Sequence, residues 1–323
     1  QVESLFGIYF LFGILLAIGG VGNGPAPVVS LVTSWFRKRR GMALSIVFVG
    51  ISAGQLVGFP LIVRLLETVG WRVSFVWLGL VLILGLAPLC FWIIRNSPKD
   101  VDFPSEEAAG PVGEEEAPVL SFRLVLTKVV RTPSFLILSS AFFSAGYAVS
   151  TMYVHWVPYA TDLGFAATTA TTAFAVGVGM SIPATLFIGP LSDRIGRKLP
   201  LCAAYLFRGT GISLFPLLQN DFALWAGPIL IGMGWLAPGP LTSALAGDLF
   251  GPRNVAVVIG FIMVIYQLGQ ASGAWVSGYL HDITGSYRIA FFLAGYLCLQ
   301  ATVISAFIKE KRWRPLSAGA TPT

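Results

Sequence analysis

The sequence predicts an all-α polytopic membrane protein, and three observations support this prediction. Apolar residues (AVILMFWYC) make up 55% of the 323 residues, charged residues make up only 11%, and the mean hydropathy is +0.78. Soluble domains usually contain roughly a quarter charged residues. The apolar residues also form blocks of about 20 residues or more, the length a helix needs to cross the hydrocarbon core of a bilayer. The sequence lacks the short alternating segments of a transmembrane β-barrel.

Nine apolar blocks are present, and each is expected to form one spanning helix. The first block has 32 residues. Two spans of about 20 residues and a turn would not fit within it, so one long, tilted helix is expected. The blocks cover Leu5–Phe36, Gly41–Leu66, Val73–Ile94, Ser134–Tyr159, Phe165–Leu191, Leu199–Leu218, Phe222–Phe250, Val255–Leu280 and Ile289–Ile308.

The distribution of Lys and Arg predicts the orientation. Of the 21 basic residues, 17 lie in loops and the tail on one side of the blocks, three lie on the other side, and Arg208 lies within a span. Cytoplasmic loops carry an excess of Lys and Arg. The basic side and the C-terminus are therefore expected in the cytoplasm, at the plasma membrane. The residues of the basic side are Arg37, Lys38, Arg39, Arg40, Arg95, Lys99, Arg123, Lys128, Arg131, Arg194, Arg197, Lys198, Arg253, Lys309, Lys311, Arg312 and Arg314.

The net charge of +6 does not indicate a nucleic-acid partner, because the basic residues lie in short loops between apolar blocks. The partners expected are the lipid bilayer, a small-molecule substrate and protons. Cys90, Cys202 and Cys298 all lie within apolar blocks, so neither a metal site nor another cofactor is expected. No nucleophile or His/carboxylate cluster lies at membrane depth, which argues against an intramembrane enzyme.

One long loop divides the chain. Residues 97–132 are acidic in the middle and rich in Pro and Gly, a composition that predicts a flexible cytoplasmic linker. The linker separates residues 1–96, with three spans, from residues 133–309, with six. Residues 310–323 form a cytoplasmic tail.

Two stretches of the chain resemble each other at an offset that drifts from 213 to 216 residues. An ordered series of matches is typical of a duplication. Spans one to three are expected to copy spans seven to nine in the same orientation, and parallel repeats are typical of secondary transporters. Spans four to six have no copy, so three helices preceding Gln1 are expected to be missing from this sequence. The matches pair Pro25 and Pro27 with Pro238 and Pro240, Phe36 and Arg39 with Phe250 and Arg253, Gly54, Gln55 and Gly58 with Gly269, Gln270 and Gly273, and 71–75 with 287–291.

The loop between spans five and six reads G-P-L-S-D-R-I-G-R-K over residues 189–198. It resembles the signature cytoplasmic loop of the major facilitator superfamily, G-x-x-x-D-R-x-G-R-[KR], at every specified position. The resemblance covers nearly the whole chain, which would correspond to helices four to twelve of the family's twelve. It implies a helical bundle in which nine of the twelve helices are present. The three spans within residues 1–96 would be equivalent to helices four to six.

Shorter motifs resemble the monocarboxylate-porter and oxalate/formate-exchanger branch of that family. They are W-F-R-K-R-R-G at 35–41, G-W-R at 70–72, D-x-F-G-x-R at 248–253 and T-G-S-Y at 284–287. Carboxylate transporters of this branch carry an acid and an arginine in helix eight, where this chain has Ser181 and Thr185. The exchangers' lysine in helix eleven has no counterpart in Val255–Leu280.

The resemblance also implies a cytoplasmic gate. Asp193 is expected at the N-terminal end of the span that begins near Gly41, where the helix dipole favours an anion. Arg197 is expected to pair with Asp248. Such contacts would hold two halves together while the cytoplasmic side is closed; the alternative is a solvated loop that only sets topology. The gate residues are Gly189, Asp193, Arg194, Gly196, Arg197, Lys198 and Asp248.

Several residues are candidates for lining a substrate cavity. A central Arg costs roughly 2.5–3.5 kcal/mol on insertion scales, so Arg208 either attracts an anionic substrate or has a structural role. Aromatic walls with a few polar groups suit an organic substrate, and His155 is a candidate for proton coupling because histidine titrates near physiological pH. The cavity candidates are Tyr147, His155, Tyr266, Gln267, Gln270, Gln55 and Arg208.

Gly50, Gly54 and Gly58 form a G-x-x-x-G-x-x-x-G stripe that Gly269 and Gly273 repeat. Small residues at this spacing let helices approach closely, so these glycines are expected to pack helices and permit rocking. They are not expected to contact substrate.

Taken together, the sequence favours a secondary transporter that moves a small organic solute, such as an organic anion, by alternating access and is driven by protons or exchange. One alternative is efflux of hydrophobic compounds, which the scarcity of mid-membrane charge favours. An alternative of a different class is a membrane receptor or scaffold that has lost transport.

Overall fold

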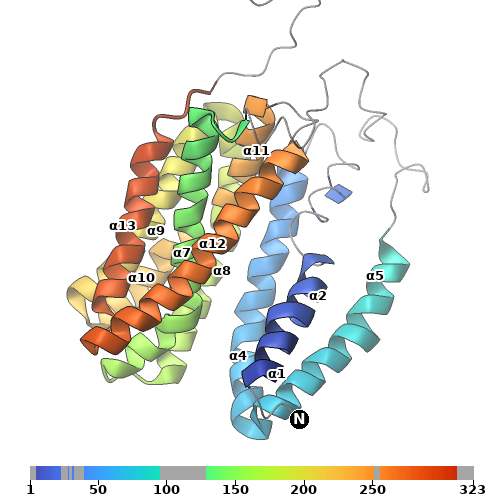
Figure 1. The fold of residues 1–323 in the computed structure, drawn as a ribbon, viewed down its shortest axis with the longest axis vertical. Helices are drawn as coiled ribbons and strands as arrows, with labels where there is room; N and C mark the ends of the chain where they lie inside the picture. The colour runs from blue at the N-terminus through green and yellow to red at the C-terminus, as the bar shows by residue number, and fades with distance from the viewer. Residues whose placement is uncertain are drawn as a thin grey trace, which may run out of the picture.

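The computed structural model describes residues 5–22, 28, 31–32, 40–94, 129–250 and 255–310. Every regular element within these ranges is a helix (Figure 1). This agrees with the all-α prediction. In a bilayer a helix satisfies its own backbone hydrogen bonds, so apolar blocks of this length have few other stable conformations.

The first part of the chain forms two helical stretches. The elements are α1 (Leu5–Ile8), η1 (Tyr9–Leu15), α2 (Leu16–Gly22), α4 (Arg40–Leu80), η2 (Val81–Leu86) and α5 (Ala87–Ile93). Gly70 interrupts α4 with φ 75° and ψ 166°, a conformation that a side chain disfavours. At this point the chain turns back, so that α5 runs in the opposite direction to α4 (Figure 1).

Residues 133–305 form a bundle of helices. The elements are α7 (Pro133–Asp162), α8 (Ala167–Ile195), α9 (Lys198–Leu218), α10 (Asp221–Met233), α11 (Pro238–Phe250), α12 (Val255–Thr284) and α13 (Arg288–Ser305). Local sequence sets several starts: Thr132 Oγ1 accepts from Phe135 N at 3.3 Å before α7, and Asn220 Oδ1 accepts from Ala223 N at 3.0 Å before α10.

Seven helices in the described ranges are long and apolar enough to cross a membrane. One of them, Ile46–Ile93, includes the Gly70 turn and so covers the second and third predicted spans. The other six cover the six spans predicted after the linker. The first predicted span is helical over residues 5–22, while most of its remainder up to Phe36 lies outside the described residues, so its length stays a prediction.

The seventh predicted span differs from the expectation of one continuous helix. The helix stops at Met233 and restarts at Pro238, leaving Gly234–Ala237 as a break between α10 and α11. Gly234 and the Pro238-Gly239-Pro240 run explain the break, because glycine weakens a helix and proline removes a backbone donor. The two half-helices still cross as one span of 30 residues.

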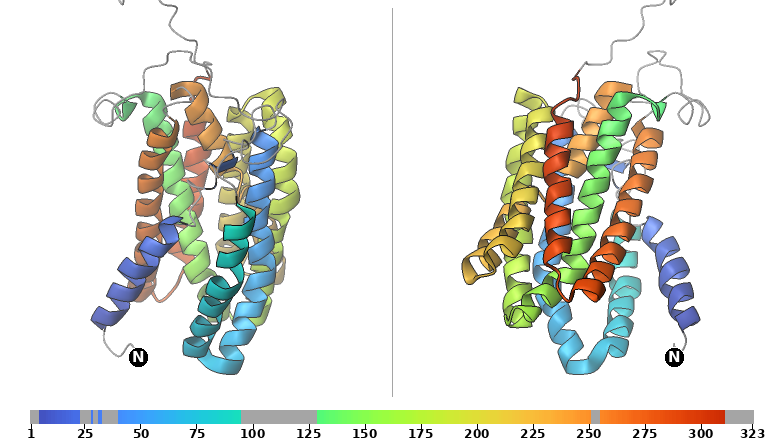
Figure 2. Two further views of the ribbon diagram at one scale, coloured as in Figure 1. Left: turned by 90° about the vertical axis from the view of Figure 1, so that its right-hand side faces the viewer. Right: turned by 60° about the vertical axis from the view of Figure 1, so that its left-hand side comes forward.

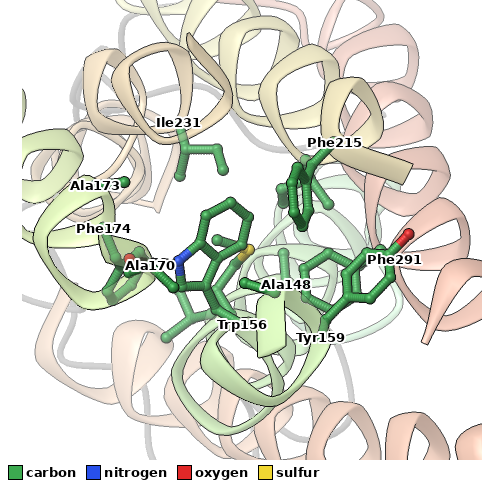
Figure 3. Close-up of a cluster of buried hydrophobic side chains, with 14 of the residues drawn as sticks. Ala148, Trp156, Tyr159, Ala170, Ala173, Phe174, Phe215, Ile231 and Phe291 are labelled. Carbon is green, nitrogen blue, oxygen red and sulfur yellow. Dashed lines mark hydrogen bonds between the residues drawn. The ribbon is translucent and has the colours of Figure 1, made fainter. Parts of the chain in front are cut away.

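The core of the bundle lies between α7, α8, α9, α10 and α13 and is rich in aromatic rings (Figure 3). Trp156 is 1% exposed and its Nε1 donates to Ala170 O at 2.8 Å. Its ring lies 4.8 Å from that of Phe215, and Tyr159 lies 4.7 Å from Phe291. These rings fix the packing of the half of the bundle farther from the basic loops.

The first part of the chain is much more exposed than the bundle. In Ile46–Ile93 none of the most apolar 18-residue window is buried, against 72% in Pro133–Asp162. Phe91 and Trp92 on α5 are 86% and 80% exposed. Figure 2 shows α1 and α2 tilted away from the other helices.

Candidate functional site

Helix α4 joins the first part of the chain to the bundle through polar contacts midway along its length. Ser52 Oγ and Ser181 Oγ lie 2.5 Å apart and both residues are fully buried. One turn further, Gln55 Nε2 donates to Tyr153 Oη at 2.7 Å. Ser181 thus serves as a contact between α4 and α8.

An aromatic cluster formed by Phe59, Tyr153, Phe174 and Trp235 lies beside these polar contacts. The ring of Tyr153 lies 6.0 Å from Phe59, 5.8 Å from Phe174 and 5.4 Å from Trp235. Tyr153 is 40% exposed, whereas Trp235 is 6% exposed. The cluster therefore combines an accessible phenol with buried rings, contributed by α4, α7, α8 and the α10–α11 break. Such an arrangement can hold an organic molecule by apolar contact and orient it by a few polar groups.

Arg208 lies next to Trp235 of the aromatic cluster, in the middle of α9. It is 1% exposed, and its Nη2 donates to Gly234 O at 2.9 Å and also to Trp235 O. Its Cζ lies 5.2 Å from the centre of the Trp235 ring. The Nε and Nη1 atoms have no hydrogen-bond partner among the described residues. Arg208 thus supplies donors to carbonyl groups that the break in the helix leaves without intrahelical partners.

The other predicted cavity residues divide between packed and open positions. Tyr147 and His155 on α7 are buried, and His155 Nε2 lies 2.9 Å from Ala274 O on α12. Because a carbonyl only accepts, this nitrogen carries the proton. On α12, Gln270 Nε2 donates to Tyr266 Oη at 3.3 Å, and Gln267 is exposed. The structure therefore packs His155 between helices and leaves the α12 residues more accessible.

At the end of the bundle away from the basic loops, α7 and α12 are joined by a cluster around His281. His281 Nε2 lies 3.3 Å from Asp162 Oδ2, forming an ion pair when the imidazole is protonated, and its ring stacks on Tyr287 at 4.1 Å. Burial, followed by the nearby carboxylates of Asp162 and Asp282, raises the pKa of Tyr287 above its usual value. This cluster connects the loop between α12 and α13 to the end of α7.

The signature loop lies at the opposite, basic end of the bundle. Arg197 Nε lies 2.8 Å from Asp248 Oδ2, so the two residues expected to pair do so, within the bundle of residues 133–305 and not between it and the first part of the chain. Glu310 Oε1 accepts from the backbone N of Arg197 at 2.7 Å and of Lys198 at 2.5 Å. A carboxylate is favoured here because these amides begin α9. The side chain of Arg197 thus attaches the loop to α11. The backbone amides of Arg197 and Lys198 attach it to Glu310, in the segment after α13.

The remaining signature residues are less constrained by contacts. Gly196 has φ +90°, a conformation that favours glycine, and a Cβ there would lie 2.6 Å from Glu310 Oε2. Arg194 is exposed, and Gly189 lies within α8, which continues through the first residues of the signature sequence to Ile195. The side chain of Asp193 lies outside the described part of the structure, so its place at the start of α4 stays a prediction.

The predicted glycine stripes differ from each other. A Cβ on Gly269 or Gly273 would overlap the backbone of Phe143 or Tyr147, so α12 approaches α7 closely there, as expected. Among the described residues, Gly50, Gly54 and Gly58 have no atom near enough to touch a Cβ. The close packing expected for this first stripe is therefore not found in the part of the chain that the structure describes.

The residues of this site that sequence reasoning did not select include Ser52, Phe59, Phe174, Trp235 and Glu310. A signal existed only for Trp235, because the glycines and prolines around it indicate a broken helix. Ser52 and Phe59 lie within four residues of the Gly54-Gln55 match, one on either side, but their partners are 94 to 129 residues away. Glu310 lies in a tail whose sequence gives no indication of a contact.

These helices and the seam of polar and aromatic contacts along α4 define an integral membrane protein in which two groups of helices meet within the bilayer. A family model described as the Major Facilitator Superfamily matches residues 2–237 and 136–322. The chain belongs to the major facilitator superfamily, a family of transporters and not of enzymes.

Individual relatives agree with this assignment. The chain is 29% identical over 312 residues to monocarboxylate transporter 11 of Homo sapiens, covering 94% of this chain and 63% of that protein. It is 25% identical over 318 residues to the oxalate:formate antiporter of Oxalobacter formigenes, covering 98% of this chain and 72% of the antiporter. The chain thus spans less than two thirds of the length of the human relative.

Among solved structures, the fucose:proton symporter FucP of E. coli is similar in fold. The TM-score is 0.63 at 16% sequence identity, covering 92% of this chain and 76% of that one. At this identity the likeness concerns the fold, and it agrees with the predicted helical-bundle class.

Proposed function

We propose that this protein is a secondary active transporter that moves a small organic solute across the plasma membrane by alternating access. The observation that carries the proposal is the seam along α4, where Gln55 meets Tyr153 beside the aromatic cluster at mid-membrane depth. Membership of a transporter family supports it. Sites at the midplane between two groups of helices are typical of such proteins.

The solute proposed is a small organic anion, moved together with protons or in exchange. The relatives named as monocarboxylate transporter and oxalate:formate antiporter support this class. In this proposal the aromatic cluster contacts the apolar part of the solute, and Gln55 and Tyr266 supply polar contacts.

A second candidate function is efflux of hydrophobic compounds. It is favoured by one observation: Ser181 and Thr185, at positions where carboxylate transporters carry charge, are buried and uncharged. A cavity without an accessible charge binds apolar molecules with less desolvation cost than anions.

The basic end is proposed to act as the cytoplasmic gate. The Arg197–Asp248 pair, with Asp193 on the same loop, would form when the cytoplasmic side is closed and break when it opens. Because the pair is partly exposed, at 30% and 39% of its side-chain areas, it can separate without stranding a buried charge. Asp193→Asn or Asp248→Asn is expected to slow transport with little change in KM.

Uptake into liposomes containing the purified protein tests the proposal. Radiolabelled formate, oxalate and a larger monocarboxylate are offered with and without a pH gradient, and with each unlabelled acid inside. Uptake stimulated by either gradient supports coupled anion transport. Uptake of a hydrophobic dye but no anion would favour the efflux alternative, and no uptake of any kind would favour a receptor or scaffold.

A further inference from the structure

Arginine side chains attach α9 both to the α10–α11 break and to the far end of half-helix α11. In the break, before α11 begins at Pro238, Arg208 donates to the carbonyls of Gly234 and Trp235. Where α11 ends, Asp248 pairs with Arg197, the residue that precedes α9. Helix α9 thus contacts the chain of α11 at the middle of the membrane and again at the basic end.

The two attachments are separated along both elements. Arg197 and Arg208 are 11 residues apart, about 16 Å at a helical rise of 1.5 Å per residue, and Trp235 and Asp248 are 13 residues apart. Helix α9 therefore acts as a brace along α11 and the break before it, so a shift at the break changes the contact at the basic end.

The attachment at the α10–α11 break depends on Arg208. Within a bilayer, backbone carbonyls without donors are costly, and the Gly234–Ala237 break creates such carbonyls. Arg208 is 1% exposed, and no carboxylate is paired with it among the described residues. Its hydrogen bonds among the described residues go to two backbone carbonyls of the break.

We infer that Arg208 is a positioning residue: it holds the α10–α11 break and thereby links the mid-membrane site to the Arg197–Asp248 gate. The inference rests on the proposed transport function. Trp235 takes part in both regions, since its ring lies 5.4 Å from Tyr153 and its carbonyl accepts from Arg208. A solute that displaces the Trp235 ring would disturb the bonds of the break and so release α11 at the basic end.

The test measures the exposure of the gate directly. A single cysteine replaces Leu245, which lies on α11 one turn before the gate and is 1% exposed, in protein whose native cysteines are substituted. The rate of its modification by a membrane-impermeant thiol reagent is measured from the basic side. Arg208→Gln and Asp248→Asn are each expected to raise this rate about tenfold, and the double variant is expected to label no faster than either single variant.

Arg288→Gln is the matched control. Arg288 Nε also donates to a backbone carbonyl, Pro216 O, at 3.1 Å, but it lies at the end of the bundle away from the gate. Its substitution is expected to leave the labelling of Leu245→Cys unchanged. If Arg288→Gln accelerated labelling equally, general loosening of the bundle would explain the result and the inference would be wrong.

Arg208→Lys provides a second variant in case Arg208→Gln does not fold. A lysine retains the charge and can reach one carbonyl, so an intermediate labelling rate is expected. Unchanged labelling in Arg208→Lys and Arg208→Gln, or multiplied rates in the double variant, would overturn the inference. Because labelling requires no substrate, a failure of the transport proposal leaves this result interpretable.

Discussion

The two glycine-glutamine sequences of this protein, at residues 54–55 and 269–270, correspond in the internal repeat but lie in different surroundings. Gly269 lies against the backbone of Phe143 on α7, while Gly54 faces open space among the described residues. The glutamines differ in the opposite sense: Gln55 bonds to Tyr153 on another helix, and Gln270 bonds within its own helix. A repeated residue type therefore does not imply a repeated role, because the role depends on the helix that packs against it.

The same contrast extends to the regions that contain these residues. The bundle formed by residues 133–305 buries large rings such as Trp156, whereas α5 exposes Trp92. The exposed region is the more apolar of the two, with a mean hydropathy of 2.4 in the most apolar 18-residue window of Ile46–Ile93 against 1.4–1.7 in those of the bundle's spans. Burial in a helical membrane protein thus depends on neighbouring helices, not on hydropathy alone.

The largest expected difference is between two tryptophans. Trp156→Ala removes a buried ring and its hydrogen bond, and is expected to cost about 3–5 kcal/mol. Trp92→Ala is expected to stay within about 0.5 kcal/mol, as is usual for exposed positions. Thermal unfolding of the purified protein in detergent measures both. A comparable loss from Trp92→Ala would mean that α5 is covered in the folded protein.

The glycine pair gives the next largest effect. Gly269→Leu places a side chain into the backbone of α7 and is expected to destabilise by about 1–3 kcal/mol. Gly54→Leu, its repeat counterpart, is expected to have little effect. The measurement is again the unfolding temperature in detergent, and equal destabilisation by the two substitutions would contradict the difference in packing.

For the glutamine pair, the residue in the first part of the chain is expected to contribute more to stability than its repeat counterpart. The expected energies are smaller than for the glycines. A double-mutant cycle of Gln55→Leu with Tyr153→Phe is expected to give a coupling energy of about 0.5–1.5 kcal/mol, the usual net value of one hydrogen bond. The corresponding cycle of Gln270→Leu with Tyr266→Phe is expected to give less, since that contact is longer, at 3.3 Å against 2.7 Å. A larger coupling for the second pair would show that the seam along α4 does not depend on Gln55.

The smallest expected effect is at the tail. Glu310→Gln removes the negative charge at the start of α9, an interaction worth about 0.3–1 kcal/mol for a helix terminus. A two- to fivefold change in the labelling of Leu245→Cys is therefore expected. Glu67→Gln serves as the control and should leave labelling unchanged, because Glu67 lies next to the Gly70 turn, at the end of the protein away from the basic loops. No change in Glu310→Gln would show that the tail contact does not support the gate.

Much of the fold could be predicted from the sequence, and less of the site. The helices after the linker agree with the predicted blocks, and the Arg197–Asp248 pair forms as expected. The pair was predictable because both residues lie in recognisable motifs at helix ends. Ser52 and Ser181 carry no motif, so their contact could not be predicted from residues 129 positions apart.

The sequence by itself determined the helical class and the membrane location, and it separated the second and third spans at a stretch that contains Gly70, whose φ is positive. These features follow from local physics: apolar blocks must satisfy their own backbone bonds in lipid, and only glycine readily adopts such a φ. Only the tertiary structure decided that Arg208 bonds to the break in the α10–α11 span, that Gly269 is packed and Gly54 is open, and that Glu310 contacts the signature loop. These features depend on which distant segments become neighbours, and the chain's local chemistry does not encode that.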